Sequence, residues 1–286
     1  MLSPFSNRNL CNKIYFYNEV KAQDDSILQL TRKKFMDNTL MIMPETAIWQ
    51  PAPVTLTLKP GEIHIWHAQM SAHFEEILSF TQVLAPDEQM RAARFKFPIH
   101  QQRYVIARGI LRQLLARYLK CPPQEIDFHY TQYGKPLLAS PISNPRLYFN
   151  ISHSENIALY AFSLTADLGV DIENIRADIE AENIAERFFA TEEVQMLKHL
   201  TAEQKIAAFF AIWTKKEAFI KAIGQGLTFS LQDFVVNLAH DSKSLVSISK
   251  GHAQDWSLLT LVPEPGYIAA IAVKTIIENL KLYGFT

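Results

Sequence analysis

Residues 213–227 read WTKKEAFIKAIGQGL, the end of a long apolar segment that predicts a helix over 202–223. Glu217 and Lys221 stand four positions apart, so a helix places both side chains on one face. An exposed ion pair is the simpler interpretation of this spacing. Two further lysines directly before Glu217 and a glycine-rich turn after the helix argue against it, because they add positive charge and room for a bulky ligand.

A second acidic stretch lies upstream, where residues 168–173 read LGVDIE. Alternation along a strand places Asp171 and Glu173 on one face, while the apolar residues next to them face the other way. An edge strand with two solvated acids is the alternative. Together with Glu217, which lies in an apolar helix, these acids and Lys221 suit a divalent cation that holds phosphate oxygens.

The composition is that of an ordinary soluble globular protein. The chain has 286 residues, is 48% hydrophobic and carries a formal net charge of -1, which is unlike the basic field of a nucleic-acid binder. Its two cysteines, Cys11 and Cys121, are too few for a metal cluster, and no apolar run reaches the length of a membrane span. The N-terminus lacks the apolar region of a signal peptide. We therefore expect a cytoplasmic protein that binds neither nucleic acid nor membrane.

Residues 1–60 differ from the rest, because charges crowd one part and prolines interrupt the other, and they predict an extension or linker. The compact part begins at residue 62. Helices are expected over 86–95, 101–119, 179–189, 191–200 and 202–223. Strands are expected over 62–66, 126–130, 147–151, 157–162, 169–172, 233–238, 245–248, 256–261 and 267–273.

The order of these elements repeats along the chain. A long helix followed by a strand occurs twice, and IALYAFS from Ile157 parallels YIAAIAV from Tyr267 at a similar distance after the first and second helices. This pattern indicates an internal duplication. Two similar lobes would leave a cleft between them, which is a common place for ligands.

Several further residues suit phosphate. His153 stands between Ser152 and Ser154, in what reads as a tight connection after a strand, and could donate to a phosphate; a structural or merely exposed histidine is the more common case. Lys135 lies in the turn YGKP, where a solvated lysine is the alternative. A local basic set, which by itself reads as a charged helix face, consists of Arg91, Arg94, Lys96 and Arg103.

Taken together, these motifs resemble the 4′-phosphopantetheinyl transferases of the two-lobed, Sfp-like type. The matching pieces occur in the family's order and roughly its spacing: YGKP at 133–136, FNISHS at 149–154, GVDIE at 169–173, RFF at 187–189 and WTKKEAFIKAIGQGL at 213–227.

The resemblance implies an α+β fold, a pseudo-dimer of two similar α/β lobes that each pack a small antiparallel sheet against a long helix. After the extension or linker at 1–60, the N-terminal lobe would cover 61–166 and the C-terminal lobe 167–286, with the active site in the cleft between them. It also implies a single-chain monomer.

The implied reaction transfers the 4′-phosphopantetheine arm of coenzyme A to a serine of an apo acyl or peptidyl carrier protein and releases 3′,5′-ADP. By this resemblance Asp171, Glu173 and Glu217 would hold Mg²⁺. Glu217 would also take the proton of the serine, and Lys221 would contact the phosphate under attack. The residues that bind coenzyme A would be Lys221 together with Arg91, Arg103, Lys135, Ser152 and His153.

Two alternatives remain open at this point. A metal-dependent hydrolase that cleaves a nucleotide pyrophosphate would use a similar cluster, and it would release 3′,5′-ADP from coenzyme A without any carrier. A non-catalytic module that binds carriers or coenzyme A is the second alternative. The complete set of Asp171, Glu173, Glu217 and Lys221 argues against it, since a binder needs no such set.

Overall fold

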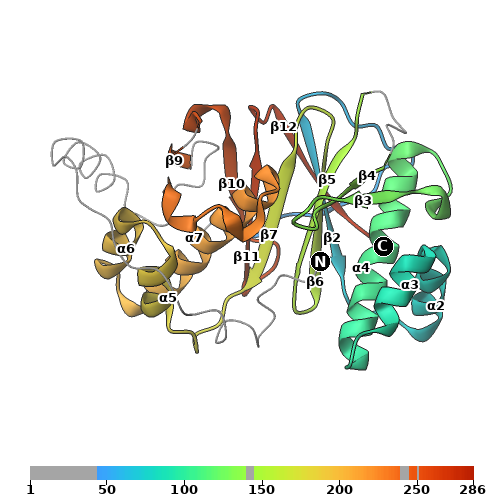
Figure 1. The fold of residues 1–286 in the computed structure, drawn as a ribbon, viewed down its shortest axis with the longest axis horizontal. Helices are drawn as coiled ribbons and strands as arrows, with labels where there is room; N and C mark the ends of the chain where they lie inside the picture. The colour runs from blue at the N-terminus through green and yellow to red at the C-terminus, as the bar shows by residue number, and fades with distance from the viewer. Residues whose placement is uncertain (1–43, 140–144, 239–244, 250) are drawn as a thin grey trace.

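The structure is a computed structural model that describes residues 44–139, 145–238, 245–249 and 251–286. Two β-sheets stand in the middle of the molecule, with one long helix at the outer side of each (Figure 1). The expected α+β class is confirmed. Within the described part of the chain, no helix is both long and apolar enough to cross a membrane.

The first sheet has the strand order β1-β12-β2-β6-β5. Strands β2, β6 and β5 pair antiparallel, whereas β12 pairs parallel with both β2 and β1. The long helix α4 and the shorter α2 and α3 cover one face, and their core includes Trp66, Leu111 and Tyr160. The bounds are β1 (Gln50–Pro51), β2 (Glu62–Gln69), β5 (Tyr148–Ser154), β6 (Ile157–Ser163), β12 (Asn279–Gly284), α2 (Phe74–Val83), α3 (Pro86–Ala93) and α4 (Pro98–Leu119).

The second sheet has the order β10-β11-β7, with antiparallel pairing throughout. Helix α7 lies across it, and α5 and α6 pack beside α7 around a core that includes Phe210, Phe219 and Ile268. Thr201 begins α7, since its hydroxyl accepts a hydrogen bond from the backbone N–H of Gln204. The bounds are β7 (Leu168–Asn174), β10 (Ser257–Leu261), β11 (Tyr267–Val273), α5 (Ala181–Phe188), α6 (Thr191–Lys198) and α7 (Ala202–Ile223).

A third apolar cluster lies between the two sheets. It joins inner-face residues such as Ile65 and Leu159 of the first sheet to Val170 and Ile271 of the second. The sheets are therefore buried on both faces, which explains why β6 is buried along its whole length. Because Val170 and Ile172 point into this cluster, the acids that alternate with them on β7 point towards α7.

Two small hairpins and short 3₁₀ turns complete the described fold. The hairpin β3–β4 precedes β5, and the hairpin β8–β9 follows α7. The bounds are β3 (Phe128–Tyr130), β4 (Pro136–Leu138), β8 (Phe234–Val236) and β9 (Leu245–Ile248), with 3₁₀ turns at Pro123–Glu125, Gly226–Thr228, Leu231–Asp233 and Ala253–Asp255.

The structure differs from the expected elements at several places, and helix α2 and the short strands β1 and β4 were not among those expected. Ser152, His153 and Ser154 belong to β5, not to a connection after it, because the strand continues until the turn at Glu155. Strand β12 was not expected at all. Residues 44–60 pack on the molecule, since the N–H of Ala47 donates to the Val262 carbonyl at 2.8 Å. The rest of the expected extension, residues 1–43, lies outside the described residues, and so does Cys11.

Candidate functional site

The site is built where β7 meets α7. Gly169 allows this approach, because a Cβ on it would lie 2.0 Å from the Ala218 carbonyl oxygen of the helix. The close contact brings the Lys221 ammonium to 2.6 Å from Oδ1 of Asp171, and the same ammonium donates to the Val170 carbonyl at 3.3 Å. The Asp171 carboxylate is buried, so this ion pair lies in a weakly screened environment.

Strand β5 supplies the next contacts through its alternating polar side chains. The Ser152 hydroxyl donates to Asp171 Oδ1 at 3.0 Å and accepts from Lys221 Nζ at 2.9 Å. One pleat further on, the Ser154 hydroxyl donates to Glu173 Oε2 at 3.2 Å. Strands β5 and β7 share no backbone ladder, so these side chains join the two sheets at the site.

Asn150 extends the same row of bridging side chains. Its Oδ1 accepts from the Val170 N–H at 2.9 Å, and the Ser154 hydroxyl accepts from the Asn174 N–H at 3.0 Å. Strand β7 is at the edge of its sheet and, in the part of the chain that the structure describes, has no neighbouring strand on this side. Both bonds therefore satisfy backbone N–H groups that would otherwise be unpaired. The row therefore fixes how far β7 stands from β5, and with it the position of Asp171.

Glu217 lies on α7 one turn before Lys221, and its side chain is almost fully buried. Its Oε1 and the Asp171 Oδ2 are buried and have no hydrogen-bond partner among the described residues. Buried carboxylate oxygens without a donor are costly, so two of them in one cluster indicate a place for a positively charged group.

Crowding of the three acids is visible in their pKa values. Burial, together with the neighbouring Asp171 carboxylate, raises the pKa of Glu173 to about 8. Burial raises the pKa of Glu217 to about 7, again with a contribution from Asp171. Burial also raises the pKa of Asp171, although the Lys221 ammonium opposes this shift. The cluster is therefore short of positive charge near neutral pH.

These acids fit a hard divalent cation in their chemistry. In the described ranges, no three His, Cys, Asp or Glu side chains already stand in a metal-holding arrangement, and the Lys221 ammonium contacts Asp171 instead. Yet the donors are carboxylates from two elements, two of their oxygens lack partners, and like charge crowds the third acid. The chemistry of Asp171, Glu173 and Glu217 therefore fits a cation such as Mg²⁺, whose preferred ligands are oxygens.

His153 and Arg103 lie at the edge of the same cluster. Burial lowers the pKa of His153 to about 4, and the positive charges of Lys221 and Arg103 act in the same direction, so the imidazole is neutral at pH 7. Arg103 donates to Glu155 Oε2 at 3.2 Å and to Asn156 Oδ1 at 3.1 Å, beside the end of β5.

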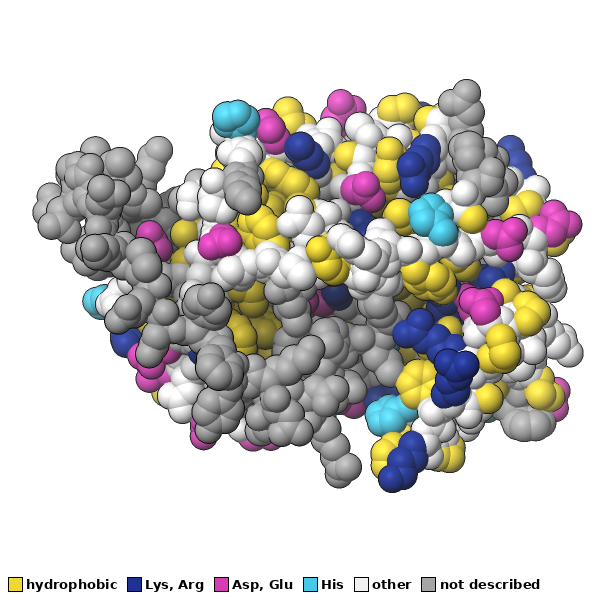
Figure 2. All heavy atoms as spheres, viewed as in Figure 1, with side chains coloured by type: hydrophobic (Ala, Val, Ile, Leu, Met, Phe, Trp, Pro, Cys, Tyr) yellow, Lys and Arg dark blue, Asp and Glu magenta, His cyan; other side chains and the backbone are white. Residues whose placement is uncertain are grey.

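Arg91 lies on α3. Its guanidinium stands over the Tyr104 ring, 5.7 Å from the centroid. Arg91, Arg94 and Lys96 are exposed around the start of α4, and Lys and Arg side chains gather on that side of the molecule (Figure 2).

Two family matches cover most of the chain. Residues 167–272 match the family described as 4′-phosphopantetheinyl transferase superfamily, and residues 66–164 match the family described as 4′-phosphopantetheinyl transferase, N-terminal. A similar protein, the 4′-phosphopantetheinyl transferase HetI of Nostoc sp., is 38% identical over 225 residues, which are 79% of this chain and 93% of HetI.

The chain belongs to the 4′-phosphopantetheinyl transferase superfamily. It is also similar to Sfp of Bacillus subtilis, at 29% identity over 69% of this chain and 85% of Sfp. The human L-aminoadipate-semialdehyde dehydrogenase-phosphopantetheinyl transferase is 34% identical over 54% of this chain and 53% of the human protein. These relatives are named as transferases, and the comparisons do not support the alternative of a pyrophosphate hydrolase.

The structure of this transferase brings only part of the expected site together. Asp171, Ser152 and Lys221 contact one another directly, and Glu173 and Glu217 join them through charge. Arg91 contacts Tyr104 and none of these side chains, and the Lys135 side chain is largely buried against α7. Sequence reasoning missed the bridging roles of Asn150 and Ser154. The alternation of Asn, Ser and Ser in FNISHS is the signal that could have found them.

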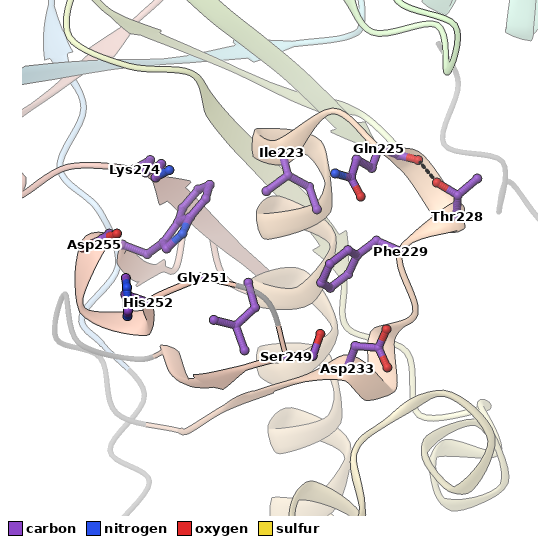
Figure 3. A pocket seen from close by; sticks show the side chains of 12 residues that line it. Ile223, Gln225, Thr228, Phe229, Asp233, Ser249, Gly251, His252, Asp255 and Lys274 are labelled. Carbon is purple, nitrogen blue, oxygen red and sulfur yellow. Dashed lines mark hydrogen bonds between the residues drawn. The ribbon is translucent and has the colours of Figure 1, made fainter. Parts of the chain in front are cut away.

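A cavity of about 350 Å³ lies on another side of the α7 C-terminus (Figure 3). Its lining mixes aromatic, apolar and charged side chains, among them Ile223, Phe229, Asp233, Asp255, Trp256 and Lys274. None of the three site acids lines it, so this cavity is separate from the carboxylate cluster.

Proposed function

We propose that this transferase moves the 4′-phosphopantetheine arm of coenzyme A to a serine hydroxyl of an apo carrier protein. The observation that carries the proposal is the meeting of Asp171, Lys221 and Glu217 where β7 approaches α7, in a chain of this family. In the reaction the serine oxygen bonds to the phosphorus that bears the pantetheine arm. The bond from that phosphorus to the bridging oxygen breaks, and 3′,5′-ADP leaves.

Glu217 receives the proton of the attacking serine in this proposal, directly or through a water. Burial raises the pKa of Glu217 to about 7 in the metal-free protein, so this carboxylate is more basic than an exposed one. The Lys221 ammonium contacts the oxygens of the phosphate under attack and balances their charge. Mg²⁺ bound by Asp171, Glu173 and Glu217 would supply further neutralisation of charge on the pyrophosphate.

Coenzyme A itself is held by residues at the cluster edge. The neutral imidazole of His153 can donate one N–H to a phosphate oxygen, and the Ser152 hydroxyl contributes from its contact with Asp171 and Lys221. Arg103 and the more distant Arg91 contribute positive charge for the 3′-phosphate. The exposed position of Arg91 supports a contact with the outer, adenine end of the molecule.

We also propose that the chain is a duplication of one lobe, with an extension at 1–60 and lobes at 61–166 and 167–286. The two long helices, α4 and α7, both have 22 residues, and β6 and β11 both lie inside their sheets. The family matches meet near the proposed boundary, ending at 164 and beginning at 167. Strand β12 crosses from the second lobe into the first sheet.

The partner in this proposal is an acyl or peptidyl carrier protein, bound by a monomeric, cytoplasmic enzyme that needs neither membrane nor nucleic acid. A single chain supplies both lobes, which supports the monomer. The near-neutral charge, together with the lack of any membrane-crossing helix in the described ranges, supports the rest.

Intact-protein mass spectrometry tests the proposed transfer. Purified apo carriers from fatty-acid, polyketide and peptide synthetases are incubated with the protein, coenzyme A and Mg²⁺. We expect a gain of one phosphopantetheine, and none on a carrier whose acceptor serine is replaced by alanine. Fast release of 3′,5′-ADP without a carrier, and no mass gain with one, would instead indicate a hydrolase.

A further inference from the structure

The β3–β4 hairpin belongs to the half of the molecule that contains the first sheet, and it contacts the end of α7. Its turn is held by the Thr131 hydroxyl, which accepts from the Lys135 N–H at 3.1 Å, and Gly134 has a φ of 79° that favours glycine. Tyr133 packs over Gly226, where an added Cβ would lie 3.4 Å from the tyrosine Cβ. The hairpin thus stands directly against the turn that ends the helix carrying Glu217.

Lys135 completes this contact with its ammonium. Nζ donates to the Ala222 carbonyl at 3.2 Å, to the Leu168 carbonyl at 3.3 Å and to Asp167 Oδ1 at 3.3 Å. An ammonium has three N–H donors, so all of them have acceptors here. The side chain is 9% exposed.

The three acceptors belong to segments that carry the site. Ala222 follows Lys221 directly and is in the last turn of α7, where carbonyls lack partners within the helix and favour a cation. Leu168 begins β7, three residues before Asp171. One ammonium therefore ties the end of α7 to the start of β7.

We propose that Lys135 is a positioning residue that holds the Asp171 strand and the Lys221 helix together, and that it does not bind the 3′-phosphate of coenzyme A. To contact a phosphate the ammonium would have to give up at least one of these three acceptors, two of which are backbone carbonyls. This inference rests on the proposed transfer reaction and adds a role within it.

The variant Lys135→Met tests this role. Its transfer activity is measured with coenzyme A and with 3′-dephospho-coenzyme A, which lacks the 3′-phosphate. The wild type is measured first, with mass gain of the carrier as readout, so that failure of the proposed function appears before any variant is used. We expect Lys135→Met to lower kcat on the order of 10- to 100-fold, because small misplacements of reacting groups have such effects. The KM for coenzyme A and the ratio of kcat/KM for the two cosubstrates should stay as in the wild type.

The contrary result is a raised KM for coenzyme A with kcat retained and a ratio that falls towards one, which would make Lys135 a phosphate ligand. Arg103→Met is the comparison variant. Because Arg103 is proposed to bind the 3′-phosphate, its loss should bring the ratio of kcat/KM for the two cosubstrates towards one. Asp167→Asn leaves both carbonyl bonds of Lys135 in place, so its kcat should stay within about twofold of the wild type.

Hydrogen exchange of the backbone amides in the wild type is a second test, and it does not require a variant to fold. Amides of 219–226 are followed with and without coenzyme A. The proposed clamp predicts that protection at the end of α7 is kept or increased when coenzyme A binds. Loss of protection there would mean that Lys135 leaves Ala222 for the ligand and would overturn the proposal.

Discussion

At the scale of single residues, the site is defined by acids that the folded chain only partly satisfies. Asp171 has Lys221 and Ser152 as partners for one oxygen, while its other oxygen and one of Glu217 have none. A protein optimised only for stability would not bury three carboxylates in this way. Such a free-energy cost is expected at a site where a bound ligand balances the charge.

Glu217→Gln should lower the activity and raise the stability of the protein. The substitution keeps the size of the side chain but removes a base, so we expect the rate of carrier modification to fall on the order of 10²- to 10⁴-fold. It also removes a buried negative charge beside Asp171. With EDTA at pH 8, urea denaturation should therefore show a free energy of unfolding about 0.5–2 kcal/mol higher than that of the wild type. An unchanged transfer rate would remove Glu217 from the mechanism.

The contribution of Glu173 to the stability of the metal-free protein should fall as pH rises, because its pKa goes from 4.5 to about 8 on folding. Between these values the folded protein holds a proton that the unfolded chain has lost, so this contribution is full below about pH 4.5 and disappears towards pH 8. The comparison is made by urea denaturation with EDTA at about pH 6.5 and 8, and a matched variant cancels the contribution of the histidines, which titrate near about 6.5 in the unfolded chain.

Glu173→Gln is the matched variant for this measurement, since it has no proton to lose. Its free energy of unfolding should change less between the two pH values than that of the wild type. Parallel curves for both proteins would contradict the raised pKa of Glu173.

At the scale of elements, the site depends on how closely α7 lies on β7. Gly169→Ala should push the two apart, because the new Cβ would meet the backbone carbonyl of Ala218, which cannot rotate away. We expect a loss of about 1–3 kcal/mol in the free energy of unfolding and a lower kcat. Gly284→Ala is the control, since its Cβ would have ordinary contacts and the change should stay within about 0.5 kcal/mol.

Local patterns predicted most helices and strands and both acid-bearing elements. The apolar spacing of α7 and the alternation in LGVDIE are local signals, and they were enough to find Asp171, Glu173 and Glu217. The end of β5 was misjudged because Ser-His-Ser is typical of a turn. In the fold these polar residues continue the strand, since Ser152 and Ser154 face β7 and bond to its acids and backbone. This reason is tertiary, and its local sign is the alternation of Asn, Ser and Ser in FNISHS.

At the scale of the whole molecule, the two halves are joined by segments from both ends of the described chain. Strand β12 inserts beside β2, and the Trp49 indole N–H donates to the Pro263 carbonyl at 2.9 Å. The Trp49 ring also stacks on His67, with centroids 5.0 Å apart. Residues 44–51 therefore contact the second half through Pro263 and the first through His67.

These connections could not be read from the sequence, because their partners are far away along the chain. NLKLYG pairs with a strand more than two hundred residues earlier, and nothing within it indicates that partner. The same holds for Lys135, which reads as a turn lysine until the end of α7 is placed beside it.

Trp49→Ala should weaken the junction between the halves. Loss of the stacked ring and its hydrogen bond is expected to lower the free energy of unfolding by about 1–3 kcal/mol. Ile48→Ala is the matched control, because the neighbouring side chain is 82% exposed and its removal should change little. Thermal unfolding followed by circular dichroism measures both. Equal melting temperatures for wild type and Trp49→Ala would show that the contact contributes nothing.

The central claim is that the acids of β7 and α7 hold one cation against the diphosphate of coenzyme A. Electron paramagnetic resonance of Mn²⁺, added in place of Mg²⁺ to the protein with coenzyme A, tests it without any turnover. We predict a bound Mn²⁺ with hyperfine coupling to phosphorus-31, lost in both Asp171→Asn and Glu217→Gln. Bound Mn²⁺ that keeps this coupling in both variants, or shows none in the wild type, would contradict the account.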